Sequence, residues 1–389
     1  MSATPDRSPR VLLVTHYFPR HRGGVESVAW EIASRLAATG RADITWHASD
    51  TDEAPAQRPG LRCVPARACN AVERRLGLPF PLWSPAALAR LVRAVRTSNV
   101  VHLHDFLYLP NLVAWAAARL SGRPVVVTQH VGEIPYRSAL LRLALAGANR
   151  VLGSLILGSA AQTLFVSQAV LDYFRRFVRF RRAPLALANG VDGVTFAFAD
   201  EPRRRALRSE IGVGMRTPLL LFVGRFVEKK GLPLLRDIVQ RLPDTRWIFA
   251  GWGPDDPARW GLPNVSVNRG LAREELVSLY QAADLLVLPS FGEGFPLVVQ
   301  EAMACGTPAL VSEATAAGCP EASAVLASEP LDGADAARRW AARIEALLGS
   351  PEAQGPLRAR VADFARSAWS WERCAQHYAE ILLACATPT

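Results

Sequence analysis

The chain has 389 residues, which is enough for two domains of ordinary size, each with its own hydrophobic core. Half of the residues are hydrophobic and no segment is of low complexity, which excludes an intrinsically disordered protein and favours a globular α/β protein. The formal net charge is +10, but no nucleic-acid-binding motif accompanies it, so nucleic acid is not an expected partner.

In the first half of the chain, short apolar runs alternate with helical patterns. Strand-like runs lie at 11–14, 43–46, 100–103, 124–128 and 163–166, and helical patterns at 26–38, 85–96 and 111–120 separate most of them. This alternation predicts a parallel, doubly wound sheet.

A second series of the same kind follows a charged stretch at 201–210, which we interpret as part of the junction between two halves. Its predicted strands lie at 219–223, 247–249 and 285–288, and its helices at 233–241, 273–282 and after Pro296. We therefore predict two α/β domains facing a cleft, residues 1–194 and 195–369. A last helical pattern lies within residues 370–389.

Targeting signals and cysteine spacing bear on the cellular compartment. Residues 1–10 contain charges but no apolar h-region, and no uninterrupted apolar stretch reaches transmembrane length. The six cysteines form no C-x-x-C pair and no paired metal-ligand spacing. We expect a cytoplasmic protein with reduced thiols.

Two glutamates, Glu293 and Glu301, lie eight residues apart across a predicted strand–loop–helix junction, with Pro296 at the first helical position. Ligands of open α/β sheets bind at such junctions, and a helix N-terminus favours phosphate. Glu301 shares a helix face with Leu297, and its two acceptor oxygens suit the two hydroxyls of a ribose. By spacing alone, a surface glutamate and a salt-bridged one are the favoured explanation of the pair.

Arg225 and Lys230 lie five residues apart in a turn directly after the first strand of the second half. Both side chains can therefore face one anion. A guanidinium offers forked donors and an ammonium offers a mobile point charge, so the pair suits a diphosphate and would stabilise the charge on a departing one. Two exposed basic residues on a loop are the alternative.

Together these strings resemble a known family. The stretch 290–309 contains E-x7-E, the stretch 224–231 matches G-R-x-x-x-x-K-G, and the stretch 19–26 is similar to P-x-x-G-G-x-E. The chain thus resembles, over most of its length, the retaining glycosyltransferases of the GT-B fold, family 4. The resemblance implies two Rossmann-like domains, with the terminal helix of 370–389 packing back on the first.

The resemblance also implies roles for individual residues. Glu293 reaches toward the sugar hydroxyls, and Arg225 and Lys230 meet the leaving diphosphate. The positions implied for donor binding are Gly23, Gly24, Gly251, Arg269, Leu271, Gly294, Phe295, Pro296, Leu297 and Glu301.

Three histidines of the first half are candidates for the reaction centre. His130 stands in a T-x-H string directly past a predicted strand, where family members use the histidine near the reacting groups. His104 ends another predicted strand and is a candidate for the acceptor side, and His16, before the Gly-Gly loop, is a third candidate.

We therefore predict a hexosyltransferase that moves a sugar from a nucleotide diphosphate sugar to a glycan, a lipid-linked or a small-molecule acceptor. No cofactor and no metal are expected, because this architecture uses basic residues and a helix terminus where the metal-dependent fold uses D-x-D. The string from Asp50 to Asp52 has that spacing but lies in a polar loop.

Two other classes of function stay open. One is another enzyme with the same architecture, such as a nucleotide-sugar epimerase or a phosphorylase. The other is a non-catalytic sensor of sugar nucleotides. The motifs define neither the sugar, the base nor the acceptor, and the stretch after Ser312 lacks the paired glycines usual in the family.

Basic and apolar stretches of the first half are compatible with a membrane surface. Residues 175–182 interleave arginines with phenylalanines, which suits contact with an anionic membrane as well as a solvated face. The apolar run 139–161, broken by Arg142 and Arg150, is either a membrane-facing element or ordinary core. Peripheral contact at the inner face of a membrane is thus an expectation.

Overall fold

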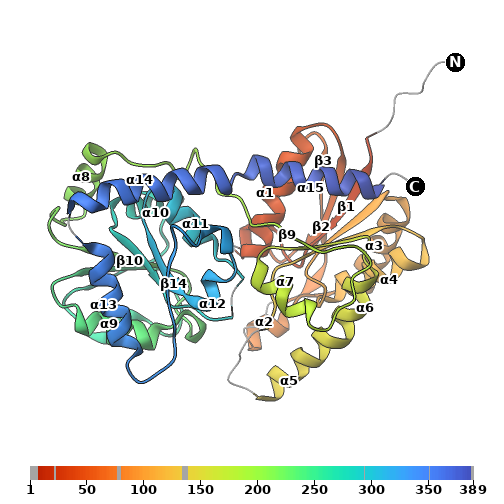
Figure 1. Cartoon of the computed structure of the whole chain (residues 1–389). Coiled ribbons are helices and arrows are strands. Elements are labelled where there is room, and N and C mark those ends of the chain that lie inside the picture. Colours follow the sequence, from red (N-terminus) through yellow and green to blue (C-terminus); the bar gives the residue numbers. More distant parts are fainter. Residues whose placement is uncertain are drawn as a thin grey trace. The chain divides into compact units, whose positions relative to one another are not determined.

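The computed structural model describes residues 8–21, 23–76, 80–133, 139–292, 294–349 and 351–386. The chain forms two compact units (Figure 1). Unit 1 comprises Met1–Asn189 and Trp371–Thr389, and unit 2 comprises Gly190–Ser370.

Unit 1 is a parallel sheet with helices on both faces. Its strands are β1 (Arg10–Val14), β2 (Asp43–Ser49), β3 (Leu61–Ala66), β6 (Val100–His104), β7 (Val125–Gln129), β8 (Gln162–Phe165) and β9 (Leu185–Ala186), in the order β3-β2-β1-β6-β7-β8-β9. A separate antiparallel pair joins β4 (Ala68–Cys69) to β5 (Leu82–Trp83). Because β1 pairs with both β2 and β6, the strand order reverses beside β1.

The helices of unit 1 are α1 (Gly24–Ala38), α2 (Ala71–Leu76), α3 (Pro85–Thr97), α4 (Leu109–Leu120), α5 (Ala139–Ala148), α6 (Ser154–Ser159), α7 (Gln168–Arg175) and α15 (Trp371–Ala386), with a short 3₁₀ turn η1 (Pro19–His21) and a π-helical segment η2 (Asn149–Gly153). The C-terminal α15 packs beside α1 (Figure 1). Arg35 of α1 donates from Nε to Glu372 over 3.2 Å, and its guanidinium lies 5.9 Å from the ring centre of Trp371.

Unit 2 repeats the plan with β10 (Leu219–Val223), β11 (Arg246–Ala250), β12 (Val265–Asn268), β13 (Leu285–Leu288), β14 (Ala309–Ser312) and β15 (Ala327–Glu329), all parallel, in the order β12-β11-β10-β13-β14-β15. Its helices are α8 (Glu201–Glu210), α9 (Leu232–Arg241), α10 (Arg273–Ala282), α11 (Leu297–Ala304), α12 (Glu313–Ala316), α13 (Ala336–Leu348) and α14 (Pro351–Ala368), with 3₁₀ turns η3 (Glu228–Lys230), η4 (Pro257–Trp260) and η5 (Pro320–Ala322). Two doubly wound parallel sheets confirm the predicted fold class.

The strands form where the sequence has short apolar runs because both faces of each sheet are covered. All five residues of β10 are buried, as are all four of β13. Each buried Leu, Val or Phe side chain contributes about 1.5–3 kcal/mol by leaving water. The polar residues that could bind a ligand therefore lie at the strand ends and in the loops that follow them.

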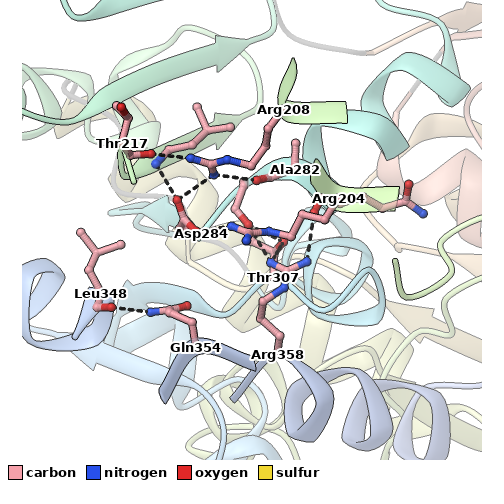
Figure 2. A network of polar contacts seen from close by, with 12 residues as sticks. Arg204, Arg208, Thr217, Ala282, Asp284, Thr307, Leu348, Gln354 and Arg358 are labelled. Atoms are coloured by element: carbon pink, nitrogen blue, oxygen red, sulfur yellow. Dashed lines mark hydrogen bonds and ion pairs between the residues drawn. The ribbon is translucent and has the colours of Figure 1, made fainter. Parts of the chain in front are cut away.

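A buried polar network closes the amino edge of the unit 2 sheet (Figure 2). Asp284, just before β13, accepts from Arg208 over 2.9 Å, from the backbone N–H of Leu219 over 2.7 Å, and from Arg204. Arg208 is fully buried and also donates to the carbonyls of Ala282 and Thr217. The network ties α8 to the starts of β10 and β13.

Arg358 of α14 completes this edge by donating to the carbonyl of Ala283 over 2.7 Å and to that of Gln281 over 2.9 Å (Figure 2). Burial lowers the pKa of Arg358 to about 10, so the guanidinium stays charged at neutral pH. The charged stretch 201–210, interpreted from the sequence as part of a junction, is instead the helix α8, with Arg204 and Arg208 buried in unit 2.

The apolar run 139–161 forms α5, η2 and α6. Within the described residues, the helical segment Ala139–Ser159 is long and apolar enough to cross a membrane by length and composition alone, with a mean hydropathy of 1.5. Only 22% of its apolar window is buried, so it is not ordinary core.

Candidate functional site

The loops at the carboxyl edge of the unit 2 sheet hold most of the predicted donor residues. β10 ends at Val223 and is followed by Gly224 and Arg225, while its neighbours β11 and β13 lead into Gly251 and Ser290. The strand order reverses at β10, between β11 and β13. Ligands of open α/β sheets bind at such a reversal, outside the carboxyl ends of the strands.

Gly251 and Gly253 allow the loop after β11 to pack onto the loop after β10. A Cβ atom on Gly251 would lie 1.9 Å from the carbonyl oxygen of Gly224, and one on Gly253 would lie 2.3 Å from that of Phe226. Both glycines also have a positive φ, 154° and 156°. The contacts therefore give Gly251 a packing role in shaping the site.

Arg225 and Lys230 differ in their surroundings. Arg225 is exposed, and its guanidinium carbon lies 5.0 Å from the ring centre of Trp252, which is itself 58% exposed. Lys230 is only 9% exposed, and a Cβ atom on Gly224 would lie 3.6 Å from its Nζ. The end of the Lys230 side chain thus lies against the bare backbone of Gly224, in space that a Cβ atom at this position would crowd.

Gly231 brings the Lys230 turn against the loop after β13. Its φ is 70°, and a Cβ atom there would lie 2.2 Å from the carbonyl oxygen of Pro289. The backbone N–H of Phe291 donates to the carbonyl of Lys229 over 2.9 Å. The two loops that carry the basic residues and the E-x7-E motif are therefore held together.

The helix α11 begins directly after this loop. The sequence predicts Pro296 as the first helical residue. It is instead the N-cap residue, and the helix begins at Leu297. Phe295 is buried, with its ring centre 5.4 Å from that of Trp369, and a Cβ atom on Gly318 would lie 2.3 Å from the carbonyl oxygen of Gly294. Glu293 lies outside the described residues.

Glu301 is held by a tyrosine that sequence reasoning missed. The hydroxyl of Tyr280, on α10, donates to Oε2 of Glu301 over 3.0 Å. Burial raises the pKa of Glu301, while the hydrogen bond from Tyr280 and the charge of Arg273 oppose that shift. A carboxylate so placed is stabilised by each further donor it receives. Tyr280 lies 21 residues before Glu301, and no sequence motif links the two.

The last predicted donor residues lie after β12. The guanidinium of Arg269 pairs with Asp256, and Gly270 has a φ of 65°. Leu271 is half-buried. The side chain of Arg269 is thus directed to Asp256.

At the carboxyl edge of the unit 1 sheet, two predicted histidines meet. His104 ends β6 and His130 follows β7, and Nδ1 of His104 lies 2.9 Å from Nε2 of His130. Both side chains are buried. Burial lowers the pKa of His130 to about 3, and burial also lowers the pKa of His104 well below its usual range, so both rings are neutral at physiological pH.

Asp105, which sequence reasoning passed over, holds the backbone of His130. Its Oδ1 accepts from the backbone N–H of His130 over 2.8 Å, and its φ of 56° is the one positive value among the described non-glycine residues. Asn111 fixes this conformation by donating to the carbonyls of His104 and Asp105 over 2.7 and 2.6 Å. Burial raises the pKa of Asp105 to about 6.

His16 lies after β1 and pairs with Glu26 rather than with the other two histidines. Its Nε2 lies 2.9 Å from Oε1 of Glu26, and its ring stacks on Tyr108 at 3.9 Å. Glu26 also lies against Gly23, where a Cβ atom would be 2.1 Å from Oε2, whereas a Cβ atom on Gly24 would meet nothing within 4 Å. Gly23 therefore makes room for Glu26, and Gly24 leaves the backbone of the first helical turn open.

The two aspartates of the D-x-D string are engaged within unit 1. Asp50 accepts from the backbone N–H of Ala68 over 3.0 Å, and Asp52 lies 2.8 Å from Nδ1 of His21. Within the described ranges, no group of three or more His, Cys, Asp or Glu side chains is arranged to hold a metal ion.

Comparisons with known proteins agree with this arrangement. Residues 22–192 match the family model described as Glycosyltransferase Family 4, and residues 217–350 match the model described as Glycosyl transferases group 1. The D-inositol 3-phosphate glycosyltransferase of Xylanimonas cellulosilytica is 29% identical over 77% of this chain and 79% of its own length. The GDP-mannose-dependent alpha-(1-6)-phosphatidylinositol monomannoside mannosyltransferase of Mycolicibacterium smegmatis is 27% identical over 76% and 78%.

Solved structures show the same fold. Sucrose-phosphate synthase from Thermosynechococcus elongatus has a TM-score of 0.77 at 21% identity, over 97% of this chain and 100% of that one. Anabaena HepE in complex with UDP-glucose has a TM-score of 0.74 at 18% identity, over the same shares. With two doubly wound units and both family models matched, the chain belongs to the GT-B glycosyltransferases of family 4, the glycosyl transferases group 1.

Proposed function

We propose that this glycosyltransferase moves a hexose-type sugar from a nucleotide diphosphate sugar to a hydroxyl acceptor, with retention of the anomeric configuration. The observation that carries the proposal is the carboxyl edge of the unit 2 sheet. There Arg225 and Lys230 follow β10. The loop after β13 is joined to this turn by the hydrogen bond from the N–H of Phe291 to the carbonyl of Lys229, and it leads into α11, which carries Glu301.

The leaving diphosphate binds Arg225, Lys230 and the first turn of α11. Lys230 lies in a buried position beside Gly224, where its charge is worth more than in water. Arg225 is exposed and backed by Trp252, so its forked donors can follow the phosphate as negative charge grows on it. The first turn of α11, whose N-cap Pro296 makes no side-chain cap, adds the fixed positive potential of a helix N-terminus.

Glu301 holds the ribose and Glu293 the sugar. Tyr280 occupies Oε2 of Glu301, so the ribose hydroxyls donate to the carboxylate alongside the tyrosine. Glu293, with the backbone of Gly294 and Phe295, orients the sugar hydroxyls. Glu293 is thus a positioning group and not a double-displacement nucleophile.

The displacement itself needs no covalent enzyme intermediate. The bond from the anomeric carbon to the phosphate oxygen breaks, and the acceptor oxygen bonds to that carbon from the same face. The proton of the acceptor hydroxyl passes to the departing phosphate. His130 contacts the reacting groups, His104 and His16 belong to the acceptor side, and the reaction requires no metal ion or other cofactor.

The relatives' names support the donor class and narrow the acceptors to be tried. HepE was solved with UDP-glucose, and the mycolicibacterial relative is named as GDP-mannose-dependent. These two names contain different bases, uracil and guanine, so both donors belong in a screen. Inositol 3-phosphate and a phosphatidylinositol mannoside are the first acceptors to test.

A thermal-shift screen against UDP, GDP, UDP-glucose and GDP-mannose tests donor binding, because a ligand of the native state raises the unfolding midpoint. No stabilisation of folded protein by any of them contradicts the proposal. Transfer is then followed with the stabilising donor, and the anomeric configuration of the product is read by NMR. Inversion overturns the retaining mechanism.

The same screen separates the other classes of function. An epimerase releases or converts the nucleotide sugar without any acceptor, and a phosphorylase needs pyridoxal phosphate. A non-catalytic sensor binds the donor but transfers to none of the acceptors.

We further propose that unit 1 contacts an anionic membrane through α5, η2 and α6, as a cytoplasmic enzyme with a lipid-linked acceptor would. Four large apolar side chains project from this segment, with exposed fractions of 79% for Leu140, 72% for Leu143, 68% for Val151 and 52% for Leu155. Arg150 lies among them, with its guanidinium 5.6 Å from the ring centre of Phe177 in the basic stretch 175–182. Apolar anchors beside arginines match an anionic lipid surface.

Co-sedimentation with vesicles tests this contact. We expect binding to vesicles that contain phosphatidylglycerol and little binding to phosphatidylcholine alone. The double substitution Leu140→Ser with Leu143→Ser should release the protein, whereas Leu120→Ser, which is 91% exposed on α4, is the matched control. Equal binding by both variants overturns the proposed surface.

A further inference from the structure

Among the described residues, the ring of His130 has one hydrogen-bond partner, His104. The atoms in contact are Nδ1 of His104 and Nε2 of His130, 2.9 Å apart. Both rings are neutral, so one of these nitrogens carries a proton and the other offers a lone pair. The direction of this hydrogen bond decides whether the other ring nitrogen of His130, Nδ1, carries a proton or a lone pair.

The far side of His104 indicates the direction of the hydrogen bond. Its Nε2 is buried and has no hydrogen-bond partner among the described residues. If Nε2 carried the proton, a buried N–H would be left without an acceptor, which native structures avoid more strictly than an unused lone pair. The proton of His104 therefore belongs on Nδ1, from which it is donated to Nε2 of His130.

The backbone of His130 is held by Asp105, the residue that directly follows His104 at the end of β6. Asp105 accepts from the N–H of His130 over 2.8 Å, and Asn111 holds the carbonyls of His104 and Asp105. His104 and Asp105 thus hold the ring and the main chain of His130 separately. The ring has little freedom to turn and present its other nitrogen to His104.

We propose that His104 is a positioning residue that fixes His130 as a neutral imidazole with its proton on Nδ1, so that His130 serves the substrate as a hydrogen-bond donor and not as a base. The lone pair on Nε2 accepts from His104, and Nδ1 already carries a proton. No lone pair is left on His130 to take the proton of the acceptor hydroxyl, which agrees with its transfer to the departing phosphate. This inference rests on the proposed function of His130.

Nitrogen NMR of ¹⁵N-histidine-labelled protein tests the inference without any activity. Protonated and unprotonated ring nitrogens have well-separated resonances, and His104→Leu and His130→Gln assign the two rings. We expect a proton on Nδ1 of both His104 and His130 at pH 7. A proton on Nε2 of either ring overturns the proposal.

The same measurement on variants separates positioning from simple packing. His104→Asn retains a donor near the position of Nδ1 and should retain the tautomer of His130, whereas His104→Leu should lose it. His102 is the matched control, because it is equally buried two residues earlier on β6 and bonds Thr128 instead, at 2.8 Å. His102→Leu should lower the unfolding midpoint but leave the tautomer of His130 unchanged.

Kinetics with the donor that the thermal-shift screen identifies complete the test. His104→Leu should lower kcat about tenfold with little change in the KM for the donor, since one neutral hydrogen bond is lost. His104→Asn should restore most of kcat. An equal loss in both variants with an unchanged NMR tautomer overturns the positioning role. Absence of transfer in the wild-type protein contradicts the proposed function instead, while the tautomer is still read by NMR.

Discussion

The hydroxyl of Tyr280 donates to Oε2 of Glu301 over 3.0 Å, from α10 to α11. This bond holds a half-buried carboxylate in place. It also lowers the pKa of Glu301 against the larger effect of burial, which raises it. If Glu301 binds the ribose as proposed, the two residues together set the pH range of that binding.

Nucleotide binding should weaken as the pH falls through the raised pKa of Glu301, because only the ionised carboxylate accepts from both ribose hydroxyls. Tyr280→Phe removes an opposing hydrogen bond, so the pKa of Glu301 rises further and the midpoint of this dependence moves to higher pH. Titration calorimetry with UDP or GDP across the acidic range measures it. Glu301→Gln should bind weakly at all pH values, and an unmoved midpoint in Tyr280→Phe would falsify the coupling.

Arg225→Ala should slow transfer about 10²–10³-fold while changing the Kd for the donor much less, because its charge acts on the phosphate as it departs. Arg225→Lys should recover part of the rate, since an ammonium lacks the forked donors. Arg236→Ala, an exposed arginine on α9, is the control. If Arg225→Ala raises Kd and leaves kcat unchanged, Arg225 binds the ground state only.

Gly231→Ala should destabilise unit 2 through two effects that can be separated. The left-handed φ of 70° costs a residue with a Cβ about 1–2 kcal/mol, and the clash with the Pro289 carbonyl at 2.2 Å adds to that. Gly270→Ala has a similar φ of 65° but meets nothing within 4 Å, so it measures the first effect alone. Equal unfolding midpoints for the two variants would show that the loops after β10 and β13 separate easily.

Asp284→Asn should lower the free energy of unfolding of unit 2 by about 3–5 kcal/mol, because Arg204 and Arg208 would keep their charges in a buried site that has lost the carboxylate they share. Calorimetry of the full chain should show this loss in one transition. Asp363→Asn removes an exposed ion pair to Arg366 and should leave the thermogram unchanged. A similar thermogram for both variants contradicts the structural role of the network.

The parts of this protein that can be predicted from the sequence are those that depend on short, contiguous stretches of residues. The buried strand 285–288 and the turn with Arg225 and Lys230 can be identified from short strings, because parallel strands covered on both faces are apolar throughout. Pairings across the fold cannot be identified in this way. His104 and His130 are 26 residues apart, and only the pairing of β6 with β7 brings them together.

The buried arginines of α8 are a second example of contacts that the sequence alone does not predict. A stretch as charged as 201–210 is expected in solvent, since arginine is almost never fully buried without a partner. Arg208 is buried because Asp284, 76 residues later, supplies that partner at the start of β13. The placement of α8 therefore depends on a contact that composition and periodicity do not encode.

Asp105 should make the stability of unit 1 depend on pH in the acidic range. Burial raises its pKa to about 6, above the value of about 3.9 for an unfolded chain. The folded state thus binds the proton more tightly, so the stabilising effect is complete below about pH 4 and is lost as the pH rises through 6. Two units of pKa correspond to about 2–3 kcal/mol.

Asp105→Asn should abolish this dependence and make unit 1 more stable than the wild type at pH 7. Asparagine tolerates the φ of 56° and keeps an acceptor for the backbone N–H of His130, but it carries no charge to bury. Asp105→Ala loses both advantages and should be less stable than the wild type. Urea unfolding at pH 4.5 and 7 measures both variants, and an Asp105→Asn protein that is less stable at pH 7 would show that the ionised carboxylate is needed to hold His130.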